Sequence, residues 1–348
     1  MRTLKYNEAL GEGTLNAMEE NSRVFLIGEG IDDPKGAFGT CLPAFKKYGS
    51  KRVFDSPLSE ATVTGMGIGA AIMGNPNVMI HMRAEFLLFA MDQIINHAAK
   101  WRYMSGGKTS VPVVIRMIIG RGWGQAAQHS QSFHAMWAHV PGLKVILPAT
   151  PADAKGMIHA AIADPDPVLS IEHRWLYGKE GDVPEGRYVA PLNKAAVLRE
   201  GKDITCVAVS HQIYDALAAA EELSKKGIEM EVIDLRSAKP IDETTILDSV
   251  RKTGRLIVTD IGIETCGITA EVITIACEKA FSSLKAAPVR IALPDVPTPC
   301  SYTLEEIYYP KMSDIVGAAK SLVKGERFLP TARQKPTAPT AVPFTGPF

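Results

Sequence analysis

Short apolar runs alternate with segments of helical periodicity through the first half of the chain. Buried strands are predicted at residues 24–27, 78–82, 111–115, 145–147 and 168–171. Helices are predicted at residues 60–73 and 89–103, and in the second of these Met91, Ile94 and Ala98 recur at helical spacing. Because strands and helices alternate, we expect a mainly parallel sheet with helices on both faces.

The same alternation starts again after residue 200. Strands are predicted at 204–209, 229–235, 256–260 and 289–293, and helices at 213–225, 244–252, 268–281 and 313–322. The chain is therefore expected to be an α/β protein of two domains, each a mainly parallel sheet flanked by helices. We place these domains at residues 1–185 and 201–324, with a linker at 186–200. Residues 325–348 carry five prolines and no periodicity, which predicts an extended tail.

Composition excludes several classes of protein. Of the 348 residues, 46% are hydrophobic and 22% are charged, and Lys+Arg and Asp+Glu number 38 each. This balance lacks the basic excess of a nucleic-acid binder. No apolar run reaches the length of a membrane span, and the first residues do not resemble a signal peptide. The five cysteines form no C-x-x-C pair, so we interpret them as reduced thiols of a cytoplasmic protein.

A glycine-rich run at residues 65–70 fits the pattern G-x-G-x-x-A. A dinucleotide-binding fingerprint of this kind lies between a strand and a helix and is followed by an acid about 20 residues later. Glu85 stands near that distance, but residues 55–62 do not form a buried strand pattern. We therefore interpret the glycines as small faces within a helix, with a nucleotide-binding dehydrogenase as a minor alternative.

Two residues are candidates for chemistry on their local pattern. Glu60 opens an apolar, glycine-rich helix, where a poorly hydrated carboxylate shares a proton or pairs with a donor. The alternative is a first-turn acid, favoured by the helix dipole and preceded by Ser59 as N-cap. His129 follows a glycine-rich loop at the carboxyl end of a predicted strand, where ligands bind in open α/β sheets. A histidine of a surface loop is the alternative there.

The ordered motifs resemble a known family. They are Arg-Val-Phe-Asp-Ser-Pro-Leu-Ser-Glu-Ala at 52–61, Asp-Gln-Ile-Ile-Asn at 92–96, Arg-Tyr-Met-Ser-Gly-Gly at 102–107, Ala-Gln-His-Ser-Gln at 127–131, Pro-Gly-Leu-Lys-Val at 141–145, Asp-Ala-Lys-Gly at 153–156 and Val-Ile-Asp-Leu-Arg at 232–236. Together they are similar to the β subunit of the E1 component of 2-oxo acid dehydrogenase complexes, which are thiamine-diphosphate enzymes of the transketolase-like kind. The resemblance covers residues 3–323. It implies a transketolase-like pyrimidine-binding domain followed by a transketolase C-terminal domain.

The resemblance also implies roles for single residues. Glu60 would face N1′ of the aminopyrimidine of the cofactor, and His129 would stand near the reacting carbon and assist acyl transfer to lipoamide. The implied cofactor-binding set is Glu29, Leu58, Glu60, Met82 and Phe86. The chain departs from the family pattern at Gly30, at Arg83-Ala84-Glu85 and at Trp123, and the last two departures lie next to the predicted site.

Metal binding is expected to be divided between two chains. The resemblance implies a potassium site made mostly by backbone carbonyls, of Val113, Ala161, Ile162, Asp164 and Asp166. The chain contains no G-D-G motif, with which thiamine-diphosphate enzymes hold Mg²⁺ and the diphosphate. We therefore expect an α subunit to bind Mg²⁺ and to complete the site in an α2β2 heterotetramer.

The sequence thus predicts an E1 β subunit that decarboxylates a small 2-oxo acid such as pyruvate and passes the acyl group to the lipoyl group of an E2 acyltransferase. The β subunit of an acetoin dehydrogenase and a non-catalytic, partner-binding subunit of the same fold are the alternatives. We expect no nucleic-acid or membrane partner. The expected compartment is the cytoplasm of a bacterium or the mitochondrial matrix of a eukaryote.

Overall fold

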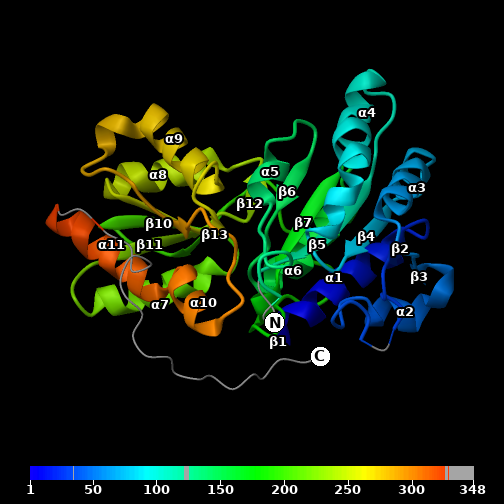
Figure 1. Ribbon diagram of the computed structural model, residues 1–348, viewed down its shortest axis with the longest axis horizontal. Coiled ribbons are helices and arrows are strands. Elements are labelled where there is room, and N and C mark those ends of the chain that lie inside the picture. The colour runs from blue at the N-terminus through cyan, green and yellow to red at the C-terminus, as the bar shows by residue number, and fades with distance from the viewer. Residues whose placement is uncertain (34, 121–124, 326–327, 329–348) are drawn as a thin grey trace. The chain divides into compact units, whose positions relative to one another are not determined.

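The chain folds into two compact units, each described here by itself. The computed structural model describes residues 1–33, 35–120, 125–325 and 328 (Figure 1). Unit 1 comprises Met1–Ile119, Met136–Asn193 and Ser237–Pro240. Unit 2 comprises Gly120–Ala135, Lys194–Arg236 and the described residues from Ile241 onward. Trp123 and most of the proline-rich tail lie outside the described residues.

Unit 1 is built on a seven-stranded sheet with the order β12-β6-β7-β5-β4-β2-β3. Its strands are β2 (Phe25–Gly28), β3 (Val53–Asp55), β4 (Asn77–His81), β5 (Val113–Ile119), β6 (Lys144–Ile146), β7 (Val168–His173) and β12 (Ser237–Lys239). All neighbours pair in parallel except β12, which runs antiparallel to β6. Every residue of β4, β5 and β7 is buried, which explains why these strands appear in the sequence as continuous apolar runs.

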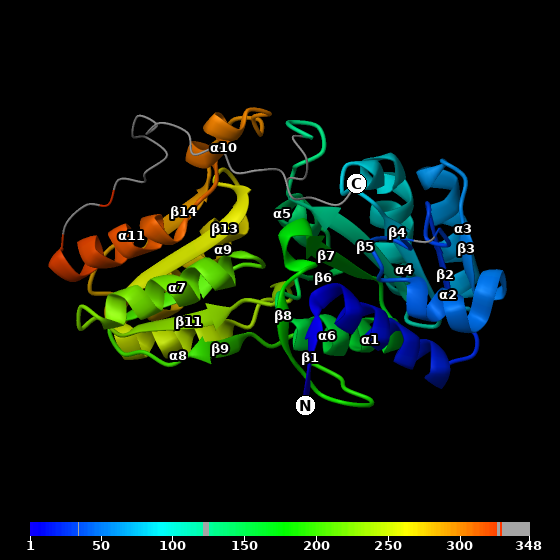
Figure 2. The ribbon, with the colours of Figure 1, turned by 90° about the horizontal axis from the view of Figure 1, so that it is seen from below.

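Helices cover both faces of the unit 1 sheet (Figure 2). On one face lie α1 (Tyr6–Glu20), α2 (Leu42–Tyr48) and α6 (Pro151–Ala163); on the other lie α3 (Glu60–Ile72) and α4 (Ala99–Met104). Beside the sheet, β1 (Arg2–Lys5) pairs antiparallel with β8 (Glu180–Val183). The short elements are η1 (Gly49–Lys51), η2 (Phe86–Ala90), η3 (Gln93–Ala98), α5 (His134–Ala138) and η4 (Arg174–Leu176). The helix predicted at 89–103 is observed as a continuous helix over residues 91–104, which contains the π-helical stretch η3 and ends with α4; the 3₁₀ turn η2 precedes it.

The glycine run at residues 65–70 lies inside α3 and lets this helix approach the sheet. A Cβ atom at Gly67 would come within 2.6 Å of the Met79 sulfur on β4, which is closer than real contacts allow. Asn77 donates from Nδ2 to the Gly67 carbonyl over 2.8 Å, which joins helix and strand at the same place. A phosphate-binding glycine loop precedes its helix, whereas these glycines occupy the helix interior. The position inside a helix is therefore confirmed, and close packing requires glycine at Gly67 but not at Gly65 or Gly69.

Unit 2 has a five-stranded sheet with the order β14-β13-β10-β11-β9. Its strands are β9 (Ala196–Arg199), β10 (Ile204–Ala208), β11 (Met230–Asp234), β13 (Leu256–Ile263) and β14 (Val289–Leu293), all parallel except β9. One face carries α7 (Gln212–Ser224) and α11 (Met312–Lys324), and the other carries α8 (Glu243–Thr253) and α9 (Ile268–Ala280). Between β14 and α11 lies α10 (Tyr302–Tyr308), and η5 (Phe281–Ser283) follows α9. The expected fold class is confirmed in both units.

Three segments do not follow the division into two consecutive domains that the sequence predicts. The segment Gly120–Ala135 belongs to unit 2, and Ser237–Pro240 belongs to unit 1. The expected linker at 186–200 includes β9, which pairs with β11 as a strand of the unit 2 sheet. Pairing with sequence-distant strands, which local apolar patterns do not reveal, accounts for β9 and β12. Within the described residues, each helix is too short or too polar to cross a bilayer.

A buried ion pair joins the centre of the unit 1 sheet to a neighbouring loop. Arg116 on β5 donates two hydrogen bonds to the Glu172 carboxylate on β7, of 2.6 and 2.9 Å, and a third of 3.0 Å to the Thr40 hydroxyl. The Tyr177 hydroxyl donates to the same carboxylate over 2.7 Å. Burial alone lowers the pKa of Arg116, but the Glu172 charge outweighs it and raises that pKa above its ordinary value. The guanidinium therefore stays charged inside the core.

Replacement of Glu172 by Gln leaves this guanidinium charged and without its counterion. We expect a loss of about 3–5 kcal/mol in the free energy of unfolding, measured by urea titration at pH 7. The control is Asp248→Asn, which breaks the exposed pair of Asp248 with Arg251 and should cost less than about 0.5 kcal/mol. Equal losses in the two variants would contradict the account of the buried pair.

Candidate functional site

Acidic side chains gather where three neighbouring parallel strands of unit 1 end. Glu29 follows β2, Asp55 is the last residue of β3, and Glu60 is the first residue of α3. The strands β4, β2 and β3 lie side by side in the sheet, so their carboxyl ends share one edge (Figure 1). In open α/β sheets this is the edge at which ligands bind.

Two short contacts fix the loops that carry these acids. The Ser56 backbone N–H donates to the Gly28 carbonyl over 3.1 Å, and the Gly30 N–H donates to the Asp55 carboxylate over 2.6 Å. Gly30 has a φ of +61°, a left-handed conformation that glycine adopts without strain. The loops after β2 and β3 are thus held together at the base of the acidic cluster.

Glu29 and Glu60 line the same small hollow, with a volume of about 10 Å³. Its other lining residues are Ile27, Gly28, Ser56, Pro57, Val63, Met79, Ile80 and His81. A hollow of this size holds about one water molecule. Unit 1 therefore supplies the floor of a site, and a larger ligand would lie over this floor rather than inside it.

The electrostatics of the hollow favour a shared proton. Burial raises the pKa of Glu29, and the neighbouring carboxylates of Glu60 and Asp55 raise it further. Like charges this close resist simultaneous ionisation. A ligand group that shares a proton with one of these acids, or carries positive charge, would relieve the repulsion.

His81 adds a neutral imidazole to the lining. It is the last residue of β4 and only 5% exposed, and burial lowers its pKa from 6.5 to about 4. Its Nε2 atom is buried with no hydrogen-bond partner among the described residues. The sequence analysis did not select His81 for the site; a polar residue at the end of a buried strand, next to a ligand-binding edge, is the signal that marks it.

The apolar residues of the implied cofactor site lie around the acids in different ways. Met82 and Phe86 are half-buried in the segment after β4, and the Met82 Cε lies 3.9 Å from where a Cβ at Gly30 would be. Leu58 is 82% exposed and is not packed onto the hollow. Arg83 and Glu85 are buried beside Met82 in the sequence. In unit 1 by itself, the Leu58 side of the acids is therefore open.

The structure places His129 in unit 2, so it is described there and not together with Glu60. His129 is half-buried in the segment that precedes α5. Five residues later His134 Nε2 lies 2.6 Å from the Asp260 carboxylate of β13, and both side chains are buried. A Cβ at Gly262 would meet His134 at 2.9 Å, so the backbone approaches this pair closely. The pair anchors the His129 segment to unit 2.

A cavity of about 300 Å³ adjoins the His129 segment within unit 2. It is lined by Ala127, Ser130, Gln131, Ser132 and Phe133 from this segment, and by Ile263, Leu293, Asp295, Val296, Pro297, Thr298 and Tyr308 from the end of the unit 2 sheet. This volume is within the range of small-molecule sites. The loop that carries His129 thus borders a space large enough for part of a substrate.

The five residues of the implied potassium site lie near the amino ends of β5 and β7. Asp164 accepts two hydrogen bonds from the Lys144 ammonium, of 2.6 and 2.7 Å, and Asp166 accepts one of 2.7 Å from Arg102. These carboxylates are already neutralised, which leaves backbone carbonyls as the available cation ligands. The described residues contain no cluster of three or more His, Cys, Asp or Glu side chains suited to a metal ion.

The burial of His81 predicts a specific loss of stability in acid. The unfolded chain binds a proton at His81 below about pH 6.5, whereas the folded chain does so only near pH 4. Stability contributed by the neutral ring is therefore present above pH 6.5 and declines as the pH falls toward 4, by about 2 kcal/mol between pH 7 and pH 5. Urea titrations of the isolated chain should show this decline to be smaller by that amount in His81→Phe. The exposed His97→Phe serves as control and should keep the full decline; an equal decline in His81→Phe would refute the assignment.

Comparisons with known proteins agree with this geometry. The family profile "Transketolase, pyrimidine binding domain" matches residues 2–179, and "Transketolase, C-terminal domain" matches residues 193–315. A solved split-gene transketolase, described as an inactive β4 tetramer, superposes with a TM-score of 0.73 at 23% identity and covers 93% of this chain and 99% of its own. At that identity the structural match shows the shared fold.

Relatives of higher identity cover nearly the whole chain. The β subunit of acetoin:2,6-dichlorophenolindophenol oxidoreductase from Cupriavidus necator is 42% identical over 93% of this chain and 98% of its own. The β-1 subunit of the mitochondrial pyruvate dehydrogenase E1 component from Oryza sativa is 43% identical over 92% of this chain and 86% of its own. The pyruvate dehydrogenase E1 β subunit of Rhizobium meliloti is 40% identical over 92% of this chain and 70% of its own. With both family profiles matched in order, the chain belongs to the family of transketolase-like E1 β subunits.

Proposed function

We propose that this chain is the β subunit of a thiamine-diphosphate-dependent 2-oxo acid dehydrogenase E1. With an α subunit it decarboxylates a small 2-oxo acid, pyruvate or a close analogue, and transfers the acyl group to the lipoyl group of E2. The observation that carries the proposal is the position of Glu60 at the carboxyl edge of the unit 1 sheet, beside Glu29 with its raised pKa. The relatives that bear E1 β names support it.

The residues of the hollow suit the pyrimidine ring of this cofactor. When bound, thiamine diphosphate supplies a carbanion at its thiazolium carbon and an electron sink. The Glu60 carboxylate would share a proton with a nitrogen of the pyrimidine ring, and the crowding of Glu29 and Asp55 promotes that sharing. Met82 and Phe86 would exclude water from one side of the ring, which strengthens the contact with Glu60. In unit 2, His129 would hold or release a proton at its imidazole during acyl transfer.

Cation binding would follow the division expected from the sequence. This chain lacks a G-D-G motif, and the part that the structure describes shows no acidic metal cluster. We assign Mg²⁺ and the diphosphate to the α subunit. A potassium ion would bind carbonyls at the start of β5 (Val113), at the end of α6 (Ala161 and Ile162) and before β7 (Asp164 and Asp166). This is the opposite edge of the sheet from Glu60, where the role of the ion would be structural.

An exposed apolar face of unit 1 is suited to the α subunit. Six large apolar side chains on or next to α3, η2 and α4 are 60% to 89% exposed: Leu58, Met66, Met73, Phe89, Tyr103 and Met104. Contiguous exposed apolar surface marks a protein interface. Because Leu58 stands two residues before Glu60 in the sequence, a chain on this face would approach the acids and would cover the cofactor. An α2β2 heterotetramer located in the bacterial cytoplasm or the mitochondrial matrix follows from the proposal.

A second candidate is the β subunit of an acetoin dehydrogenase, which cleaves a carbon–carbon bond without release of CO₂. It is favoured by the 42% identity to the Cupriavidus necator subunit and the 40% identity to the Bacillus subtilis one. The buried Arg83 and Glu85, which depart from the usual family residues, lie next to Met82 of the proposed pocket. Assay of the reconstituted αβ enzyme with pyruvate, branched 2-oxo acids and acetoin, with a dye acceptor, distinguishes the two.

The Glu60→Gln variant tests the catalytic role directly. Loss of the exchangeable proton should lower kcat of the reconstituted enzyme by at least about 100-fold with any of these substrates. Glu243→Gln is the matched control, because Glu243 is likewise the first residue of a helix and lies in unit 2; it should keep full turnover. Full turnover of Glu60→Gln would instead favour a non-catalytic, partner-binding subunit.

The Met66→Glu variant tests the proposed interface. A charge in the middle of the apolar face should weaken assembly with the α subunit by at least about tenfold, because an unpaired carboxylate would be buried on association. Sedimentation velocity of the α and β mixture measures the change. The control is Phe281→Glu on η5 of unit 2, where Phe281 is 72% exposed. Unchanged assembly in Met66→Glu would place the α subunit elsewhere.

A further inference from the structure

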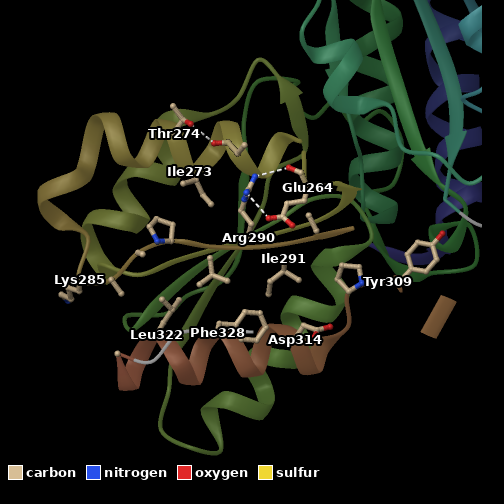
Figure 3. A pocket seen from close by; sticks show the side chains of 18 of the residues that line it. Glu264, Ile273, Thr274, Lys285, Arg290, Ile291, Tyr309, Asp314, Leu322 and Phe328 are labelled. Atoms are coloured by element: carbon tan, nitrogen blue, oxygen red, sulfur yellow. Dashed lines mark hydrogen bonds and ion pairs between the residues drawn. The ribbon is translucent and has the colours of Figure 1, made fainter. Parts of the chain in front are cut away.

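Unit 2 has a groove beside β14, remote in sequence from the residues of the proposed chemistry. Its volume is about 930 Å³. It is bordered by α9 on one side and by the start and end of α11 on the other, with β14 between them (Figure 3). Most of its lining is aliphatic or aromatic: Ala270, Ile273, Ala286, Ala287, Pro288, Val289, Ile291, Ala292, Tyr308, Tyr309, Pro310, Leu322 and Phe328.

The groove exposes the edge of a sheet. β14 pairs with β13 on one side, and on its other side it pairs with no strand among the described residues. The free edge of a strand presents unpaired backbone N–H and C=O groups, which proteins normally cover. A segment of extended chain laid along β14 would satisfy these groups and bury the apolar lining together.

The charged residues of the groove are already engaged by the fold. Arg290 pairs with Glu264 over 3.0 Å and also donates to its carbonyl over 3.1 Å. The Lys285 ammonium donates to the Thr253 carbonyl over 3.2 Å, and the Asp314 carboxylate accepts the Lys311 backbone N–H over 2.9 Å. The groove therefore offers an apolar and aromatic surface and is poorly suited to a charged small ligand.

The chain itself leads into this groove. α11 ends at Lys324, and Gly325 takes a left-handed φ of +74°, which turns the backbone out of the helix. Phe328 then lies over α11, its ring 3.0 Å from where a Cβ at Gly317 would be. Phe328, which twenty residues follow in the sequence, thus belongs to the lining of the groove (Figure 3).

The composition of residues 329–348 matches the lining. The segment contains five prolines, including the spacing Pro336-x-x-Pro339, together with Phe344 and Phe348, and it has no acidic residue. Proline-rich segments dock in grooves lined by aromatic side chains, since their extended conformation costs little entropy to fix. Phe328 and the largely buried Tyr308 and Tyr309, whose ring centroids lie 5.0 Å apart, are the aromatic residues of the lining here.

We propose that residues 329–348 bind in the groove of their own chain and cover the outer edge of β14. The segment lies beyond the matched C-terminal domain, which ends at residue 315. In this arrangement residues 329–348 are an intramolecular ligand of the groove and exclude other ligands from it. The proposal does not depend on the catalytic role of Glu60.

Hydrogen–deuterium exchange of the full chain and of a chain that ends at Phe328 tests this proposal. The backbone amides of residues 286–293 should exchange at least about tenfold more slowly in the full chain, because the tail covers the edge of β14. Amides of β9, at the opposite edge of the same sheet, are the internal control and should not change. Equal exchange of residues 286–293 in both proteins would overturn the proposal.

Peptide binding identifies the occupant. A synthetic peptide of residues 329–348 should bind the truncated chain, and Ala270→Arg, which fills the groove from α9, should weaken binding at least about tenfold. Glu278→Arg, on the exposed side of the same helix and outside the groove, is the matched control. Because the prolines supply the preformed conformation, a peptide with Pro336, Pro339 and Pro343 replaced by Ala should also bind more weakly. Docking within one chain would be contradicted if neither change weakened binding. It would also be contradicted if the full chain showed slower exchange only at concentrations at which sedimentation detects a dimer.

Discussion

The gathering of three carboxyl groups at one sheet edge is the constraint on which the proposed chemistry depends. Parallel pairing of β4, β2 and β3 brings Glu29, Asp55 and Glu60 to one edge because each acid follows the carboxyl end of its strand or opens the next helix. Burial raises the pKa of Glu29, and the nearby charges of Glu60 and Asp55 raise it further. The sheet topology, the packing of α3 through Gly67 and the contacts of Gly30 all serve to keep these acids close together.

The same unit is incomplete as a binding site. The hollow between the acids has room for little more than one water molecule, and apolar side chains beside it face outward. These two features are related, because a cofactor bound over the hollow would need a second protein surface to exclude water. An interface between two different chains meets both needs with a single set of contacts. Catalysis and assembly would then be coupled by construction in the proposed enzyme.

Much of this architecture could be predicted from the sequence. Strands buried on both faces are continuous apolar runs, and this is why those of both sheets were found within a few residues of their observed bounds. Short partners such as β9 and β12 have no such pattern and are defined only by the strand beside them. The His134–Asp260 contact, which anchors the His129 segment to unit 2, joins residues 126 positions apart, and no local spacing indicates it. The apolar periodicity likewise predicts the helix of residues 91–104 but does not indicate its π-helical stretch η3 or the 3₁₀ turn η2 before it.

The residues of the candidate site could also be predicted only in part from the sequence. Motif resemblance selected Glu29, Glu60, Met82 and Phe86, and the structure places them around one edge of the sheet, although their roles stay predictions. It did not select His81, because a histidine within an apolar run looks like part of the core until the ligand-binding edge is located.

The edge strand β12 of the unit 1 sheet has a consequence for folding during translation. β12 comes from residues 237–239, after three strands of the other sheet have already passed in the chain. During synthesis from the amino terminus, the first sheet therefore remains one strand short until about two thirds of the protein has been translated. The two units therefore cannot complete their folding strictly one after the other during translation. Cleavage of the chain between residues 193 and 194 would separate β12 from the polypeptide that carries the rest of the unit 1 sheet.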